Sequence, residues 1–216
     1  MRHILIASAI VATLAACSNG EKTARYLIDP PAPSERVANR LGTTELKDVS
    51  LPDYASGDEV SWQTVDGAVR SNTKELWADA PQRSFTQTLA RTISDISGAT
   101  VIPEPWPLAE PPRRTLEVRV EKALAQADGT YRLSGRYFVG DSGAGGANQA
   151  RSFDIAVPMG TAEPTPAIIA RAQSQAISQL ARQIAVLGGP GNSVRTSSSA
   201  PRMDDIFSQP LPPLDG

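Results

Sequence analysis

The chain contains a single cysteine, Cys17, among its 216 residues. No disulfide can therefore link two parts of the chain, although small secreted domains often depend on such links. The fold must instead rest on a hydrophobic core. A chain of roughly 200 residues is long enough to bury such a core within one domain, so a single domain with polar tails is expected.

Residues 1–16 have the parts of a secretory signal. Arg2 precedes an apolar run over residues 4–16, and small residues end that run. The run is shorter than the roughly 20 residues that a transmembrane helix needs. Ala15 and Ala16 before Cys17 resemble the lipobox of bacterial lipoproteins. The resemblance implies cleavage between Ala16 and Cys17, a diacylglyceryl group on the Cys17 thiol, and acylation of the new amine, for example with palmitate.

The residue after the cysteine is Ser18. In sorted lipoproteins an aspartate at that place is the usual signal for retention in the inner membrane, so the resemblance favours the outer membrane. Two or more acyl chains anchor a protein stably where one does not. We therefore expect a lipid-anchored domain that faces the periplasm. The alternative is a soluble secreted protein whose cysteine lies near the cleavage site by chance.

Composition excludes several kinds of chemistry. Removal of residues 1–16 removes His3, the only histidine, and the lipid occupies Cys17. The mature chain then has no imidazole and no free thiol, which excludes Ser-His-Asp and Cys-His nucleophiles, zinc held by histidine or cysteine, and thiol redox chemistry. No metal or cofactor is expected. Losing Arg2 leaves 20 basic against 23 acidic residues, a net charge of −3, so nucleic acid is an unsuitable partner.

The first part of the mature chain reads as a tether followed by short strands. Residues 17–35 are polar and bear prolines, which predicts a lipidated tether that leads into the domain. A first strand is expected within residues 25–28 and a second over residues 45–51. A hairpin is expected from residue 60 onward, with Asp66-Gly67 as its turn.

Two helices are predicted by apolar residues at helical spacing. The first begins near Pro81, with Trp77 on a preceding turn, and ends at Gly98. The second covers residues 166–187. Residues 188–216 are rich in serine, proline and glycine, so a disordered C-terminal tail is expected there.

Between the helices, alternating patterns predict strands over residues 100–102, 114–125, 131–139 and 153–157. The last three form an antiparallel meander with one face in water. The fold class is therefore α+β, a mixed or antiparallel β-sheet with two helices packed on one face. Five prolines make residues 103–112 a loop or an extended arm around Trp106.

Three groups of residues are candidates for function. Trp106 is the best candidate for a protein contact, because a proline-rich arm cannot join a sheet and tryptophan is favoured at interfaces; core packing is expected for Trp62 and Trp77. Glu117 and Glu121 could serve as an acid and a base in glycoside hydrolysis, but solvated charges on a polar strand face are the simpler interpretation. The glycine-rich residues 140–147 lack the Lys-Ser/Thr of a phosphate-binding loop and predict a flexible hairpin loop.

A family resemblance rests on two motifs within this plan. A strand ends in Leu51-Pro52-Asp53-Tyr54, and a helix opens near Trp77-Ala78 before the long meander and an alanine-rich last helix. In this respect the chain resembles the ABC-type transport auxiliary lipoproteins, the PqiC-like group. The family domain would cover residues 25–187.

The resemblance implies an accessory, non-enzymatic role with no catalytic residues. Family members work beside MCE-domain proteins in lipid transport between membranes, so an MCE-domain protein is the expected partner and Tyr54, Trp77 and Trp106 are candidate contacts. A homo-oligomer is left open. The alternatives are a lipoprotein that binds peptidoglycan or assists outer-membrane assembly, and a cell-wall hydrolase that uses carboxylates alone.

Overall fold

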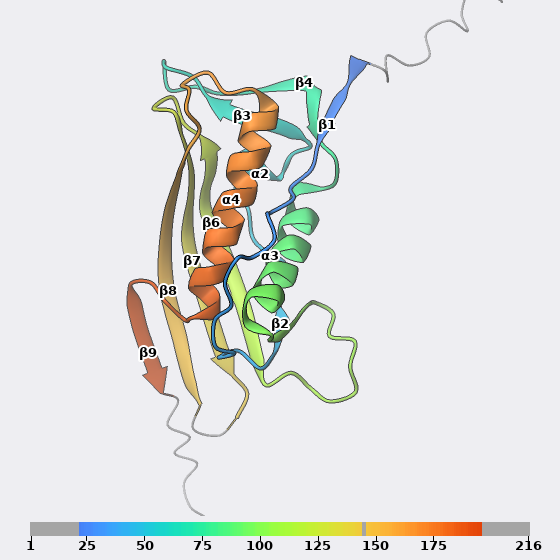
Figure 1. The fold of residues 1–216 in the computed structure, drawn as a ribbon, viewed down its shortest axis with the longest axis vertical. Helices are drawn as coiled ribbons and strands as arrows, with labels where there is room; N and C mark the ends of the chain where they lie inside the picture. Colours follow the sequence, from blue (N-terminus) through green and yellow to red (C-terminus); the bar gives the residue numbers. More distant parts are fainter. Residues whose placement is uncertain (1–21, 144–145, 196–216) are drawn as a thin grey trace, which may run out of the picture.

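A computed structural model describes residues 22–143 and 146–195 of the chain (Figure 1). These residues form one mixed sheet in the order β1-β4-β3-β6-β7-β8-β9, with β2 between β5 and the start of β6. Two long helices cover one face of the sheet. The α+β class expected from the sequence is confirmed. The strands are Ala24–Tyr26 (β1), Thr43–Leu46 (β2), Glu59–Gln63 (β3), Val69–Trp77 (β4), Thr100–Pro103 (β5), Arg114–Ala125 (β6), Thr130–Asp141 (β7), Ala147–Pro158 (β8) and Gly191–Arg195 (β9).

The centre of the sheet is the antiparallel meander β6-β7-β8, as predicted. Alternation in its strands buries one set of side chains under the helices and leaves the other set, which is mostly polar, on the open face. The register shifts between Val120 and Lys122, opposite Gly135, so β6 changes its alternation at a β-bulge. The buried set from these strands includes Leu116, Val118, Val120, Tyr131, Leu133, Tyr137, Phe153, Ile155 and Val157.

The two predicted helices are α3 (Pro81–Ser97) and α4 (Pro166–Ala185), and both begin with the proline expected in a first helical turn. Gly98 ends α3 in the left-handed conformation, which glycine adopts without strain. The helices lie side by side on the sheet (Figure 1), and both bury their apolar stripe. A third helix, the four-residue α2 (Asp53–Ser56), was not predicted.

The sequence interpretation was wrong around Trp77. This residue ends strand β4 and does not lie on a helical turn, because α3 begins only at Pro81. Residues 70–74 are polar and exposed, so they carry no alternation that could reveal a strand. Pairing with its hairpin partner β3 and with β1, which lies about 50 residues earlier in the chain, decides the conformation. The strand expected over residues 45–51 is likewise shorter, since β2 ends at Leu46 and only Ser50 bridges to β6 afterwards.

The predicted tether over residues 17–35 is too long. Residues 24–26 form β1 beside the end of β4, and Ile28 is buried in the core. The segment then crosses both helices (Figure 1). There the Asp29 amide donates to Ser174 Oγ over 3.0 Å, and Arg182 pairs with Glu35 at 2.7 Å. The proline-bearing segment is thus part of the folded domain.

The predicted C-terminal tail also begins later than expected. Residues 191–195 form β9, which pairs with β8 at the edge of the sheet. The hydroxyl of Tyr137 donates to the Gly188 carbonyl, and Arg151 donates to the Gly191 carbonyl over 2.8 Å. The sequence of β9 contains glycine and serine and has no apolar alternation, so it does not indicate a strand. Its conformation is instead determined by the hydrogen bonds to β8. Residues 196–216 lie outside the described part of the chain.

Candidate functional site

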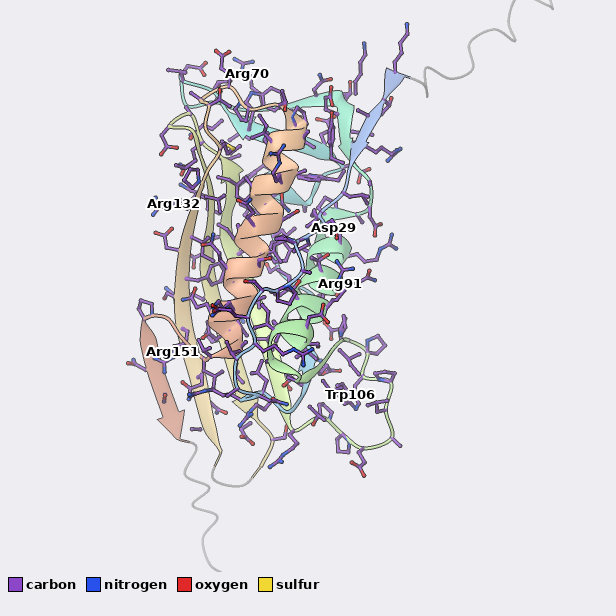
Figure 2. All side chains as sticks on the ribbon, in the orientation of Figure 1. Asp29, Arg70, Arg91, Trp106, Arg132 and Arg151 are labelled. Atoms are coloured by element: carbon purple, nitrogen blue, oxygen red, sulfur yellow. The ribbon has the colours of Figure 1, made fainter. Side chains whose placement is uncertain are left out.

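The loop between β5 and β6 carries the first candidate site. We name residues 104–113 the Trp106 loop; it lies at the opposite end of the molecule from the start of β1 (Figure 2). The Trp106 indole Nε1 donates to the Glu110 carbonyl over 2.7 Å, which closes the loop on itself. Trp106 remains partly exposed, and Leu108 has 51% of its surface in solvent. The loop therefore presents apolar surface in a defined shape.

Both ends of the Trp106 loop are tied to the β2 region. The Trp106 amide donates to Glu45 Oε1 over 3.1 Å, and the Arg113 amide donates to Thr43 Oγ1 over 3.1 Å. Lys47 Nζ lies 2.8 Å from a Glu45 carboxylate oxygen and 3.0 Å from one of Glu104. We name Glu45, Lys47 and Glu104 the loop clamp, since they hold the first residues of the loop.

Contacts made by the loop clamp residues shift the pKa values of Glu104 and Lys47. Two hydrogen bonds, first from the Asp48 amide and then from Lys47, lower the pKa of Glu104 from its ordinary value. Hydrogen bonds to Glu45 and then Glu104 raise the pKa of Lys47. Both shifts favour the charged forms, so the clamp is an ion cluster near neutral pH.

The other two aromatic candidates lie elsewhere and face inward. Trp77 has only 6% of its surface exposed and belongs to the core. Tyr54, on α2, accepts a hydrogen bond from the Ala123 amide at 3.2 Å through its hydroxyl oxygen. Both side chains line a cavity of about 10 Å³ beside Tyr131, which has room for about one water molecule. Tyr54 and Trp77 therefore serve internal packing in this structure, whereas Trp106 does not.

Trp62 packs against the core with part of its surface exposed, as expected. The two carboxylates weighed for catalysis lie on the open face of the sheet. Glu117 pairs with Arg119 at 2.6 Å, and Glu121 lies 3.6 Å from Arg136. All four side chains are more than two-fifths exposed, which agrees with the solvated-charge interpretation. The glycine-rich segment joins β7 to β8 as a hairpin loop.

The lipid site predicted at Ala16 and Cys17 lies outside the described residues, so it stays a prediction. Within residues 22–143 and 146–195, no helix is long and apolar enough to cross a membrane. The same residues contain no cluster of three acidic, histidine or cysteine side chains suited to a metal ion.

Sequence reasoning missed the residues that shape the Trp106 loop. In the sequence, Glu45, Lys47 and Glu104 resemble ordinary surface charges, because the contacts that join Glu45 and Lys47 to the Trp106 loop span more than 50 residues of chain. A proline-rich segment indicates a loop but not which strand holds it. The one usable signal was the conjunction of Trp106 with prolines that keep it out of the sheet.

The fold and motifs define a family. The sequence profile described as ABC-type transport auxiliary lipoprotein component matches residues 26–185, nearly all of the folded domain. The chain belongs to this family of auxiliary lipoproteins, as the resemblance suggested.

Two curated relatives carry a more particular description. The chain is 30% identical over 136 residues to the intermembrane transport lipoprotein PqiC of Escherichia coli K12, and equally to that of Shigella flexneri. Each match covers 60% of this chain and 70% of the relative. The family and these relatives support an auxiliary role in transport.

Solved structures share the fold. One crystal structure of an uncharacterized protein superposes with a TM-score of 0.58 at 21% identity, covering 71% of this chain and 97% of the other. A crystal structure of a Xanthomonas campestris protein gives a TM-score of 0.51 at 13% identity, covering 76% of this chain and 93% of the other. At these identities the similarity concerns the fold alone.

Proposed function

We propose that this chain is an outer-membrane lipoprotein, anchored through Cys17, that serves as a docking subunit for an MCE-domain protein in lipid transport between membranes. The observation that carries the proposal is the family match over residues 26–185, preceded by the lipobox-like Ala15-Ala16-Cys17. The two PqiC relatives are intermembrane transport lipoproteins, which supports the part of the proposal that concerns transport between membranes. Holding a partner requires no reaction, so this role needs no catalytic group.

The Trp106 loop supplies the docking contact in this proposal. Interfaces draw most of their binding energy from a few aromatic or apolar side chains. Trp106 and Leu108 offer such side chains, and the loop clamp holds the Trp106 backbone before any partner arrives. A surface that is ordered in advance loses less conformational entropy on binding.

Site-specific photocrosslinking in cells tests the docking contact. A benzophenone amino acid replaces Leu108 in one variant and Ala156 in the control variant. Ala156 is also exposed, but it lies on the open face of β8, away from the loop. The proposal expects an adduct with an MCE-domain protein from position 108 and none from position 156. Equal adducts from both positions, or no MCE-domain adduct from position 108, contradict the assignment of the loop.

A second experiment tests the affinity and the anchor. Trp106→Ala should lower recovery of the MCE-domain protein from gentle detergent extracts while leaving the unfolding temperature nearly unchanged, since Trp106 is outside the core.

Cys17→Ser should leave the domain folded and release it into the soluble periplasmic fraction. Recovery of the Cys17→Ser protein with outer membranes in high salt contradicts anchoring through Cys17.

A further inference from the structure

Some of the exposed apolar side chains belong to the residue after β1 and to the neighbouring hairpin. In the described residues, large apolar side chains are exposed at Leu27, Val65, Val69, Leu108 and Val186. Leu27 directly follows β1, Val65 lies in the turn between β3 and β4, and Val69 begins β4. We name residues 22–27 and 63–74 the hairpin end. Figure 1 shows β1 and this hairpin at the same end of the molecule, and Figure 2 places Arg70 there and Trp106 near the other end.

The turn of the hairpin holds Val65 in solvent. The Thr64 amide donates to the Ala68 carbonyl over 2.9 Å, and the Gly67 amide donates to the Thr64 carbonyl over 2.8 Å. Gly67 adopts a positive φ of 87°, which the turn requires. Val65 has 86% of its surface exposed, and it lies in a hydrogen-bonded turn. Its exposure is therefore a property of the folded turn and does not result from fraying.

The length of chain before β1 brings this end close to the lipid. Seven residue steps separate Cys17 from Ala24, where β1 begins. Even a fully extended chain spans at most about 25 Å over seven residues. The twelve-residue strands of the meander are about 40 Å long. The anchor is thus shorter than the domain, and β1 enters the domain at the hairpin end.

We propose that the hairpin end lies against the bilayer that holds Cys17, with the Val65 side chain in the lipid headgroup region. This inference rests on the lipid anchor of the proposed function. The hairpin end also carries the exposed basic residues Lys22, Arg25, Arg70 and Lys74. Their long side chains can place their charges at phosphate level while their methylene stems cover apolar surface. In this orientation the Trp106 loop points away from the membrane.

Fluorescent labelling of the lipidated full-length protein tests the contact. With Cys17 acylated, Val65→Cys and Leu108→Cys each carry one free thiol, because the chain has no other cysteine. Both positions are exposed and apolar, which makes them a matched pair. Each variant is labelled with an environment-sensitive dye and reconstituted in vesicles of phosphatidylethanolamine and phosphatidylglycerol, with or without a nitroxide-labelled headgroup lipid.

The proposal expects a blue shift of the dye at position 65 in vesicles and a loss of its emission when nitroxide lipid is present. The dye at position 108 should keep its aqueous spectrum and its intensity. Flotation of the same samples on a density gradient reports the anchor separately. Protein that floats with the vesicles while position 65 stays as aqueous as position 108 overturns the orientation but leaves the anchor intact. Protein that does not float overturns the anchor, and the orientation falls with it.

Discussion

At the residue scale, Gly135 shows how closely two strands of the meander approach each other. A Cβ atom on Gly135 would lie 2.1 Å from the backbone oxygen of Arg119, at the bulge where β6 shifts its register. That oxygen belongs to a paired strand and cannot move without breaking the ladder. A side chain at this position therefore forces the two central strands apart.

We expect Gly135→Ala to destabilise the domain by at least about 1–3 kcal/mol, the usual cost of an overpacked site. Gly57→Ala is the matched control, since no atom lies within 4 Å of a Cβ there and Gly57 has an ordinary negative φ. The control should stay within about 0.5 kcal/mol of the parent. Urea unfolding of both variants measures the difference, and equal midpoints would show that the strands can separate at no cost.

Single residues were predictable where a periodic pattern marked them. Leu116, Val118 and Val120 alternate with charged residues, and all three are buried as predicted. Gly135 carries no such mark, because its role depends on a backbone atom 16 positions earlier in the chain. The sequence reveals which face a residue occupies more readily than how closely another strand approaches it.

At the element scale, a buried threonine joins α3 to the segment after β2. Thr86 Oγ1 accepts a hydrogen bond from the Val49 amide at 3.0 Å and donates to the Gln82 carbonyl over 2.8 Å. Thr92, also buried on α3, donates only within its own helix, to the Thr88 carbonyl over 2.7 Å. Valine has the shape of threonine and nearly the same helix propensity.

Thr86→Val should therefore cost about 1–3 kcal/mol, because it leaves the Val49 amide buried without its acceptor. Thr92→Val removes a similar hydroxyl without depriving another segment of an acceptor, so its effect should be clearly smaller. Thermal unfolding of the two variants makes the comparison. A Thr92→Val protein as unstable as Thr86→Val would refute the link between α3 and Val49.

The loop clamp predicts a dependence on pH. Hydrogen bonds lower the folded-state pKa of Glu104, so its contribution is present above its ordinary pKa of 4.5 and is lost as the pH falls through the lower folded value. The pKa of Lys47 is raised, so its contribution is present below 10.5 and is lost as the pH rises through the higher folded value. The Trp106 loop should thus be most ordered between these limits.

Nuclear magnetic resonance of the Trp106 indole N–H, assigned with Trp106→Phe, measures this order. On the acid side we expect its signal to shift or broaden only at pH below about 4.5, as the Glu104 carboxylate becomes protonated. Glu104→Gln should bring the low-pH signal to neutral pH and cost less than about 1 kcal/mol in global stability, since both side chains of the pair with Lys47 are more than one-third exposed. A signal that is the same in both proteins at pH 7 would remove Glu104 from the clamp.

Helices and strands with a long apolar repeat were predicted more completely than those without one. The helices α3 and α4 and the meander carry long apolar patterns, and each was predicted with its order in the chain. The polar strand β4 and the short strands β1 and β9 owe their conformation to partners far away in the sequence, so their boundaries or existence were missed. The Trp106 loop was recognised as a loop, but its clamp depends on β2 and could not be predicted.

At the scale of the whole molecule, the first and last strands of the described domain complete the sheet. β1 lies beside β4 at one edge, and β9 lies beside β8 at the other. Neither strand has an apolar core pattern of its own, so each depends on the hydrogen bonds of its partner strand.

The C-terminal edge yields a final prediction. Deletion of residues 196–216 keeps β9, whereas deletion of residues 189–216 removes it together with the hydrogen bond from the Ser152 amide to the Pro190 carbonyl, 2.7 Å long. The second deletion also leaves the Arg151 guanidinium without its Gly191 acceptor and opens the edge of β8. Open edges pair with other chains.

We expect the shorter deletion to leave the unfolding temperature unchanged. The longer deletion should lower it by several degrees, because a chain of this size loses about 2–4 °C per kcal/mol. Light scattering should show self-association of the longer deletion alone, through the exposed β8 edge. If the two truncated proteins unfold at the same temperature and both stay monomeric, β9 adds nothing to the domain, and residues 188–195 belong to the tail after all.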